Sequence, residues 1–297
     1  MLTVINATQS RLDLEDLQLW RNVGLHIDEN GLLVQQTPLN ISSSLDNEDY
    51  DADVDGSVVI EEDVVSNGLV WLLSRIVNFI TAGDGLSPGD FELPAGSRNQ
   101  TAVAQEDLLK RWKRLELELQ TWHEHLPPTF APCLRANMPS TNSTPDSCSK
   151  VWYSIPMCAA TVQCYHMARI LLLMNKPQES TAIRSTVTAR MRSYRLIQQE
   201  VLYHSRDIYG ISLCSLPDAV RLHSLQPLFV AGQCLSEQSE RQIILDLLLN
   251  VERDLGWATD YRIQQLLREW EVERMQESSA PSELADQRRL LRNSPTY

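Results

Sequence analysis

Residues 221–270 constrain the fold more than any other stretch, because apolar side chains recur there at the period of an α-helix almost without interruption. They predict three consecutive helices, over about residues 216–235, 238–255 and 259–270. The middle helix carries one apolar face, made of Ile244, Leu247, Leu248, Val251 and Leu255. The last helix repeats the spacing with Ile263, Leu266, Leu267 and Trp270. Such faces are buried against neighbouring helices, so this stretch indicates helix packing rather than catalysis.

The boundaries of these three helices are marked by individual residues. Ser215 can cap the first helix as part of a capping box. Pro227 removes a backbone N–H inside that helix, which predicts a kink or break just before it. Gly256 follows the second helix, where a left-handed residue commonly ends a helix. Thr259 or Asp260 can then cap the third helix.

Further helices are predicted upstream. A short one is expected within residues 12–24, and residues 64–82 carry the wide apolar stripe of a largely buried helix. Residues 157–175 are almost entirely apolar, which predicts a central position in the core. His166 is a polar exception there, and we expect it to be buried with a backbone carbonyl as its partner. Residues 182–211 predict a long helix with a basic start.

Residues 102–126 carry the most regular periodicity of the chain. Their apolar residues alternate in steps of four and three, which is a heptad seam: Leu108, Trp112, Leu115, Leu119 and Trp122. Two interpretations are open. The preferred one is a long helix packed inside its own domain. The alternative is an interaction seam that pairs two copies of the chain as a coiled-coil homodimer.

The chain is expected to divide into three parts. Residues 1–63 hold a short helix and an acidic flexible linker, residues 64–270 a helical regulatory domain, and residues 271–297 a polar tail. Residues 127–146 are rich in Pro, Ser, Thr and Asn and predict a loop. No strand-like alternation bounded by hairpin turns is visible, so the predicted fold class is all-α, as an irregular multi-helix domain.

One candidate metal site falls in the acidic linker. Asp51, Asp53, Asp55 and Glu62 match the D-x-D-x-D-G-x5-E pattern of calcium loops. An amphipathic helix should enter such a loop, and the residues before Asp51 do not form one. A solvated acidic loop is therefore the preferred interpretation, and no cofactor is predicted in this chain.

No arrangement of residues indicates an enzyme. Phosphate-binding and dinucleotide-binding motifs are missing from the sequence. Gly85, Ser87 and Gly89 match the G-x-S-x-G pattern of a nucleophile elbow, but Pro88 follows the serine and lacks the backbone N–H that the oxyanion hole requires. We therefore predict a protein that is not an enzyme.

Charge and cysteine usage restrict the partners and the compartment. The net charge is −13, and nine acidic residues with no Lys or Arg lie within residues 46–63, which argues against binding nucleic acid unaided. The six cysteines include no C-x-x-C pair, and the first ten residues lack the features of a secretory signal. An intracellular location follows. No apolar run of 18 or more residues is visible, so no membrane partner is predicted.

Four stretches of the sequence carry a resemblance to a known family. They are LHSLQPLFVAGQCL at residues 222–235, ERDLGWATDYRIQQLLREW at 252–270, YHMARILLLMNKP at 165–177, and a W-R-x-x-G-L-x-I-D-E-x-G pattern at 20–31. Over about residues 20–270 the chain resembles the C-terminal regulatory region of fungal-specific zinc binuclear cluster transcription factors. In that family an N-terminal six-cysteine cluster binds zinc and DNA, and a large helical region follows.

The resemblance implies a regulatory or effector region, located in the nucleus, that acts in transcription by RNA polymerase II. The partners would be proteins of the transcription machinery or a homologous transcription factor. The zinc cluster needs cysteines spaced about C-x2-C-x6-C, twice over, whereas the first cysteine here is Cys133. Zinc, and contact with DNA, are thus expected only through a cluster that this chain does not contain. The alternative is an interaction module without DNA binding, which dimerises with or sequesters a full-length relative.

Overall fold

The computed structural model describes residues 17–28, 33, 61–81, 98–137, 149–177 and 187–292. Its helices are α2 (Leu17–Asn22), α3 (Glu61–Thr81), α4 (Arg98–Glu124), α5 (Pro156–Met174), α6 (Val187–Ser212), α7 (Asp218–His223), α8 (Leu225–Cys234), α9 (Gln238–Leu255) and α10 (Asp260–Arg292). A 3-10 turn, η3 (Pro128–Phe130), and two strands, β1 (Leu134–Asn137) and β2 (Ser149–Trp152), complete the described elements. The predicted all-α class is confirmed.

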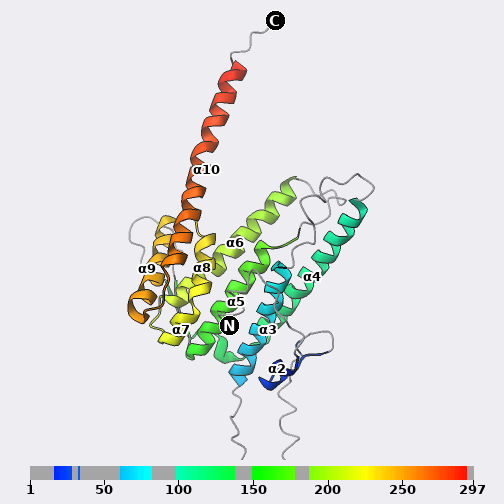
Figure 1. The fold of residues 1–297 in the computed structure, drawn as a ribbon, viewed down its shortest axis with the longest axis vertical. Coiled ribbons are helices and arrows are strands. Elements are labelled where there is room, and N and C mark those ends of the chain that lie inside the picture. The colour runs from blue at the N-terminus through cyan, green and yellow to red at the C-terminus, as the bar shows by residue number, and fades with distance from the viewer. Residues whose placement is uncertain are drawn as a thin grey trace, which may run out of the picture.

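Helix α5 runs through the middle of the fold, as the sequence predicts (Figure 1). It contacts α3 and α4 on one side and α6, α7 and α8 on the other. Most of its side chains are buried, because nearly every position faces a neighbouring helix. Pro156 occupies the start of the helix, where the missing N–H would have had no partner within the helix. Burial of this apolar helix stabilises the fold by about 25 cal/mol for each Å² removed from water.

Two helices are long and apolar enough to cross a membrane when judged by length and composition alone. They are Glu62–Thr81 and Pro156–Met174, whereas the sequence predicted no such run. The buried share is 50% for the first span and 72% for the second. Their buried apolar side chains pack into the core of the described structure, as those of core helices in folded proteins do.

The stretch at residues 216–270 contains four helices where three were predicted. The first predicted helix is broken at Ser224 into α7 and α8. Because of this break, Pro227 lies in the first turn of α8, where a backbone N–H has no partner within the helix. The missing N–H of Pro227 therefore costs no hydrogen bond there. The predicted cap at Ser215 is wrong, because the residue before α7 is Pro217 and no side chain caps the helix. The left-handed stop is confirmed: Gly256 has a φ of 68°.

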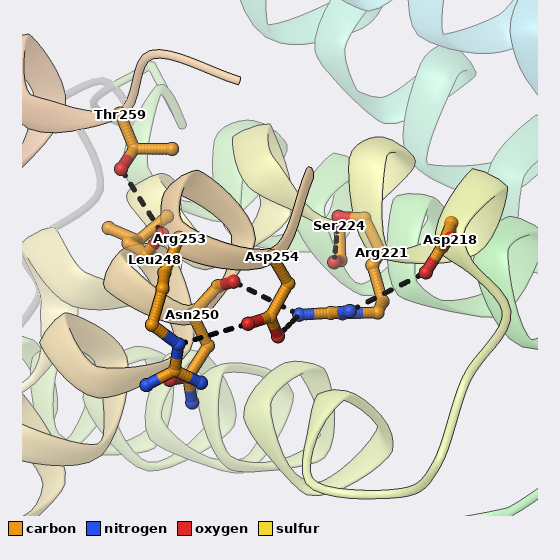
Figure 2. A network of polar contacts seen from close by, with 8 residues as sticks. All are labelled: Asp218, Arg221, Ser224, Leu248, Asn250, Arg253, Asp254 and Thr259. Atoms are coloured by element: carbon orange, nitrogen blue, oxygen red, sulfur yellow. Dashed lines mark hydrogen bonds and ion pairs between the residues drawn. The ribbon is translucent and has the colours of Figure 1, made fainter. Parts of the chain in front are cut away.

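A polar network fastens α7 to the end of α9 (Figure 2). Arg221 reaches Asp254 Oδ2 at 2.6 Å and the Asn250 carbonyl oxygen at 3.1 Å. Thr259 precedes α10, as predicted, but its hydroxyl donates to the Leu248 carbonyl at 3.1 Å instead of capping the helix. The turn between α9 and α10 is therefore held by bonds back to α9.

Helix α10 extends further than predicted. The sequence indicated a helix ending near Trp270 and a polar tail over residues 271–297, yet α10 continues to Arg292 and projects from the body of the protein (Figure 1). Its first part is anchored: Ile263, Leu266 and Trp270 are buried, and the indole of Trp270 donates to the Gly232 carbonyl at 3.0 Å. Most residues after Trp270 are Glu, Arg, Gln, Leu and Ala, which have a high helix propensity, whereas Pro281 within the same stretch opposes a helix.

Strands β1 and β2 form an antiparallel pair within a region where no strand was predicted. Leu134 pairs with Trp152 and Asn137 pairs with Ser149. With four residues each, the strands are too short to show a recognisable alternation. Packing of β2 against α6 instead selects the extended conformation.

Candidate functional site

The predicted seam of α4 faces the interior of this chain. Trp112, Leu115, Leu119 and Trp122 are buried in the main hydrophobic core, and Leu108 packs against it at the edge. Two indoles also bond to neighbouring helices: Trp112 Nε1 donates to the Leu172 carbonyl of α5 at 2.7 Å, and Trp122 Nε1 donates to the Val65 carbonyl of α3 at 3.1 Å. These contacts favour the interpretation of a helix packed inside its own domain.

The calcium-loop candidate lies mostly outside the described residues. This holds for Asp51, Asp53 and Asp55, whereas Glu62 lies in the first turn of α3. Among the described residues, no group of three His, Cys, Asp or Glu side chains could hold a metal ion. The G-x-S-x-G match at residues 85–89 also lies outside them.

A pair of buried histidines lies between α5 and α6. His166 of α5 and His204 of α6 face each other with their Nδ1 atoms 2.7 Å apart. Only one of the two nitrogens can carry a hydrogen at that distance, so one ring donates and the other accepts. His166 is buried as predicted, but its partner is another imidazole and not the expected backbone carbonyl.

Both histidines are held in the neutral form. Burial lowers the pKa of His166 to about 3, with the neighbouring ring of His204 acting in the same direction. Burial also lowers the pKa of His204 to about 4, and the positive charge of Arg169 adds to this. Arg169 itself forms an ion pair with Glu200 at the side of the histidine pair.

Asp207 connects the histidine pair to the protein surface. Its Oδ2 lies 3.6 Å from His166 Nε2, while its two oxygens accept bonds of 2.7 and 2.9 Å from Arg135 of β1. Burial acts to raise the pKa of Asp207, but the hydrogen bonds and charge of Arg135, together with His166, outweigh it and hold the pKa below its usual value. The carboxylate is thus ionised, and it fastens the strand pair to α6.

A surface cleft of about 350 Å³ opens above this ion pair. The face that α6 presents to it follows three- and four-residue steps: Gln199, Leu202, Tyr203, Arg206 and Asp207. Arg135 of β1 and Ser149 of β2 complete the lining. Arg206 is held by Glu240 of α9, whose Oε1 accepts from Nε at 2.8 Å. The cleft, the Asp207–Arg135 pair and the histidine pair form one connected polar site within the described structure.

Sequence reasoning found one member of this site, His166, and missed Arg135, His204 and Asp207. A signal for His204 exists, because it lies between the inward-facing Val201 and Ile208 at the helical period of α6. Asp207 and Arg135 are 72 residues apart, and no local pattern connects them.

The histidine pair predicts a loss of stability in mild acid. Since the folded-state pKa values of about 3 and about 4 lie below the usual 6.5, the unfolded chain binds more protons as the pH falls below 6.5. The free energy of unfolding should decrease by about 1.4 kcal/mol per pH unit for each histidine, down to pH about 4. Urea unfolding at pH 7, 6 and 5 measures this slope.

The control for this prediction is His204→Asn, which removes one of the two titrating rings. It should lower the slope by about the contribution of one histidine, whatever its effect on stability at pH 7. Burial also lowers the pKa values of His123 and His223, so these residues add to the loss of stability in acid. Both are present in the variant and in the unchanged protein, so they do not affect the comparison. Equal slopes in the two proteins would contradict the assignment of neutral buried rings.

Comparison with known proteins gives one informative similarity. No family model matches the chain, and no solved structure matches it. A curated protein, transcription activator AMTR1 of Alternaria alternata, is 42% identical over 273 residues, which cover 90% of this chain. The chain spans 34% of that relative's length. Over nearly its whole length, then, the chain is similar to about a third of a fungal transcription activator.

Proposed function

We propose that this chain is a regulatory region of a fungal transcription activator, which acts in transcription by RNA polymerase II through contacts with other proteins. The observation that carries this proposal is the identity of 42% over 273 residues with a transcription activator. The proposed location is the nucleus. The proposed partners are proteins of the transcription machinery or a homologous transcription factor.

Exposed apolar side chains on α6 and α10 support a role in protein contacts. On the first turns of α6, Val187, Met191 and Tyr194 are exposed and recur at four- and three-residue steps, so they share one face. Val272 and Met275 are exposed on α10, which projects from the body of the protein (Figure 1). Exposed apolar residues that group together are typical of protein interaction surfaces. A module that dimerises with a relative would use surfaces of this kind, because the seam of α4 is buried.

The negative net charge of this chain supports the proposal that another part of the transcription activator contacts DNA. A net charge of −13 repels the phosphate backbone, and the cysteines do not follow the spacing of a zinc cluster. In this proposal, zinc and DNA are bound by a six-cysteine module outside these 297 residues, and this chain regulates what that module does.

Fusion of the chain to an unrelated DNA-binding domain tests this function. We expect the fusion to change transcription of a reporter several-fold relative to the DNA-binding domain alone. Met191→Asp places a charge on the exposed face of α6 and should reduce that change, whereas Leu249→Asp, at an exposed position of α9, serves as the matched control.

A gel shift tests the assignment of DNA contact to another module. The isolated chain should select no defined site from a random DNA pool. A folded fusion without effect, or site selection by the chain alone, would contradict the proposal.

A further inference from the structure

The cleft beside α6 differs in charge from the protein as a whole. Two guanidinium groups line it, those of Arg135 and Arg206, against one carboxylate, that of Asp207. Each guanidinium is paired with a buried carboxylate, Arg135 with Asp207 and Arg206 with Glu240, so the cleft is close to neutral. The chain as a whole carries −13. A nearly neutral concavity lined by guanidinium N–H groups repels a small anion less than the average surface of such a protein does.

Both arginines keep N–H groups for a ligand. A guanidinium has five N–H donors. Arg206 uses one of them on Glu240 and another toward Tyr209, while Arg135 uses two on Asp207 and a third toward Tyr203, so each guanidinium keeps at least two. Glu240 and Asp207 are themselves buried, and each holds its arginine in place from behind. Donors that are oriented before binding lose less conformational entropy when a ligand arrives.

We propose that this cleft binds a small organic anion through a carboxylate or phosphate group held by Arg206 and Arg135. Planar guanidinium groups match the two oxygens of either group with paired hydrogen bonds. Gln199 offers a further polar group at the same face, and Leu202 offers apolar contact to the rest of the ligand. The Tyr203 hydroxyl is already hydrogen-bonded to Asp207 and helps to hold the ion pair. The volume of about 350 Å³ lies at the lower end of small-molecule sites, which span roughly 300–1,000 Å³.

Because the two arginines lie on different elements, a bound anion would also stabilise the fold. Arg135 belongs to β1 and Arg206 to α6, so an anion between them joins the strand pair to the helix. That contact adds a second link between β1 and α6 beside the Arg135–Asp207 bond, which lies against the His166–His204 pair in the core. Binding should therefore raise the unfolding temperature of the whole domain.

The test is isothermal titration calorimetry of the full chain at constant ionic strength, in a buffer without phosphate or carboxylate. The probes are citrate, succinate, inorganic phosphate and glycerol 3-phosphate, and glycerol is the neutral control. We expect one-to-one binding of a carboxylate or a phosphate probe, with an increase in unfolding temperature, and no heat from glycerol. The two groups of probes distinguish which headgroup the cleft prefers.

Two variants locate the binding. Gln199→Glu adds a negative charge at an exposed cleft position and should weaken binding at least tenfold without loss of folding. The same change outside the cleft, Gln264→Glu on α10, should leave binding unchanged. Arg206→Gln should also weaken binding at least tenfold, with circular dichroism to verify its fold because Glu240 loses a partner. Absence of binding by every probe, or equal binding by Gln199→Glu, would overturn the proposal. The measurement needs no transcription assay, so its outcome is independent of the function proposed above.

Discussion

Leu119→Asp is expected to destabilise the protein strongly. Leu119 is 0% exposed and lies in the main core, on the face of α4 that the sequence singled out as a seam. A carboxylate there would lie among apolar core side chains, and an uncompensated buried charge costs several kcal/mol. Since a domain of this kind is stable by only about 5–15 kcal/mol, the loss should be evident as a large drop in the urea midpoint, followed by circular dichroism.

The matched control is Leu117→Asp, two residues away on the same helix. Leu117 is 64% exposed, so the same substitution there should change stability by less than about 0.5 kcal/mol. Size-exclusion chromatography separates the two interpretations of the seam. If Leu119→Asp only dissociated a dimer and left the unfolding temperature of the monomer unchanged, the seam would be intermolecular.

Gly210→Ala is the second substitution with a large expected effect. A Cβ atom at Gly210 of α6 would lie 2.4 Å from the carbonyl oxygen of Ser149 in β2, and a backbone oxygen cannot move aside cheaply. Either the strand pair separates from α6 or the helix shifts, at a cost of about 1–3 kcal/mol or more. In a helix without this contact, Gly→Ala would raise the free energy of unfolding by about 1 kcal/mol. The presence or absence of the close contact with β2 therefore decides the sign of the effect.

Gly68→Ala on α3 is the control for helix propensity. Its Cβ would meet the nearest atom, Nε1 of Trp122, at 3.4 Å, which an ordinary contact tolerates. We expect this variant to be as stable as the unchanged protein or more stable, while Gly210→Ala unfolds at a lower urea concentration. Stabilisation by both substitutions would show that β2 does not approach α6 as closely as the structure has it.

The local sequence determined the helices whose apolar faces follow the helical period. For α9 the predicted bounds agree with the structure, because both the stripe through Ile244, Leu248 and Val251 and the stop at Gly256 are encoded within a few residues. The central position of α5 followed from its apolar composition alone. Periodicity also selected the buried face of α4, but it could not say whether that face meets its own chain or a second copy, since both bury the same side chains.

Tertiary structure alone decided the strand pair and the polar site. Strands β1 and β2 are too short to carry a pattern, and they exist because α6 presents a residue without a side chain, Gly210, for β2 to approach. The pairs His166–His204 and Arg135–Asp207 join residues that are 38 and 72 positions apart. A helical period relates residues three or four positions apart, so it places each of these side chains on an inward or outward face. Which partner it meets there depends on how the helices and strands pack, and no local pattern records that.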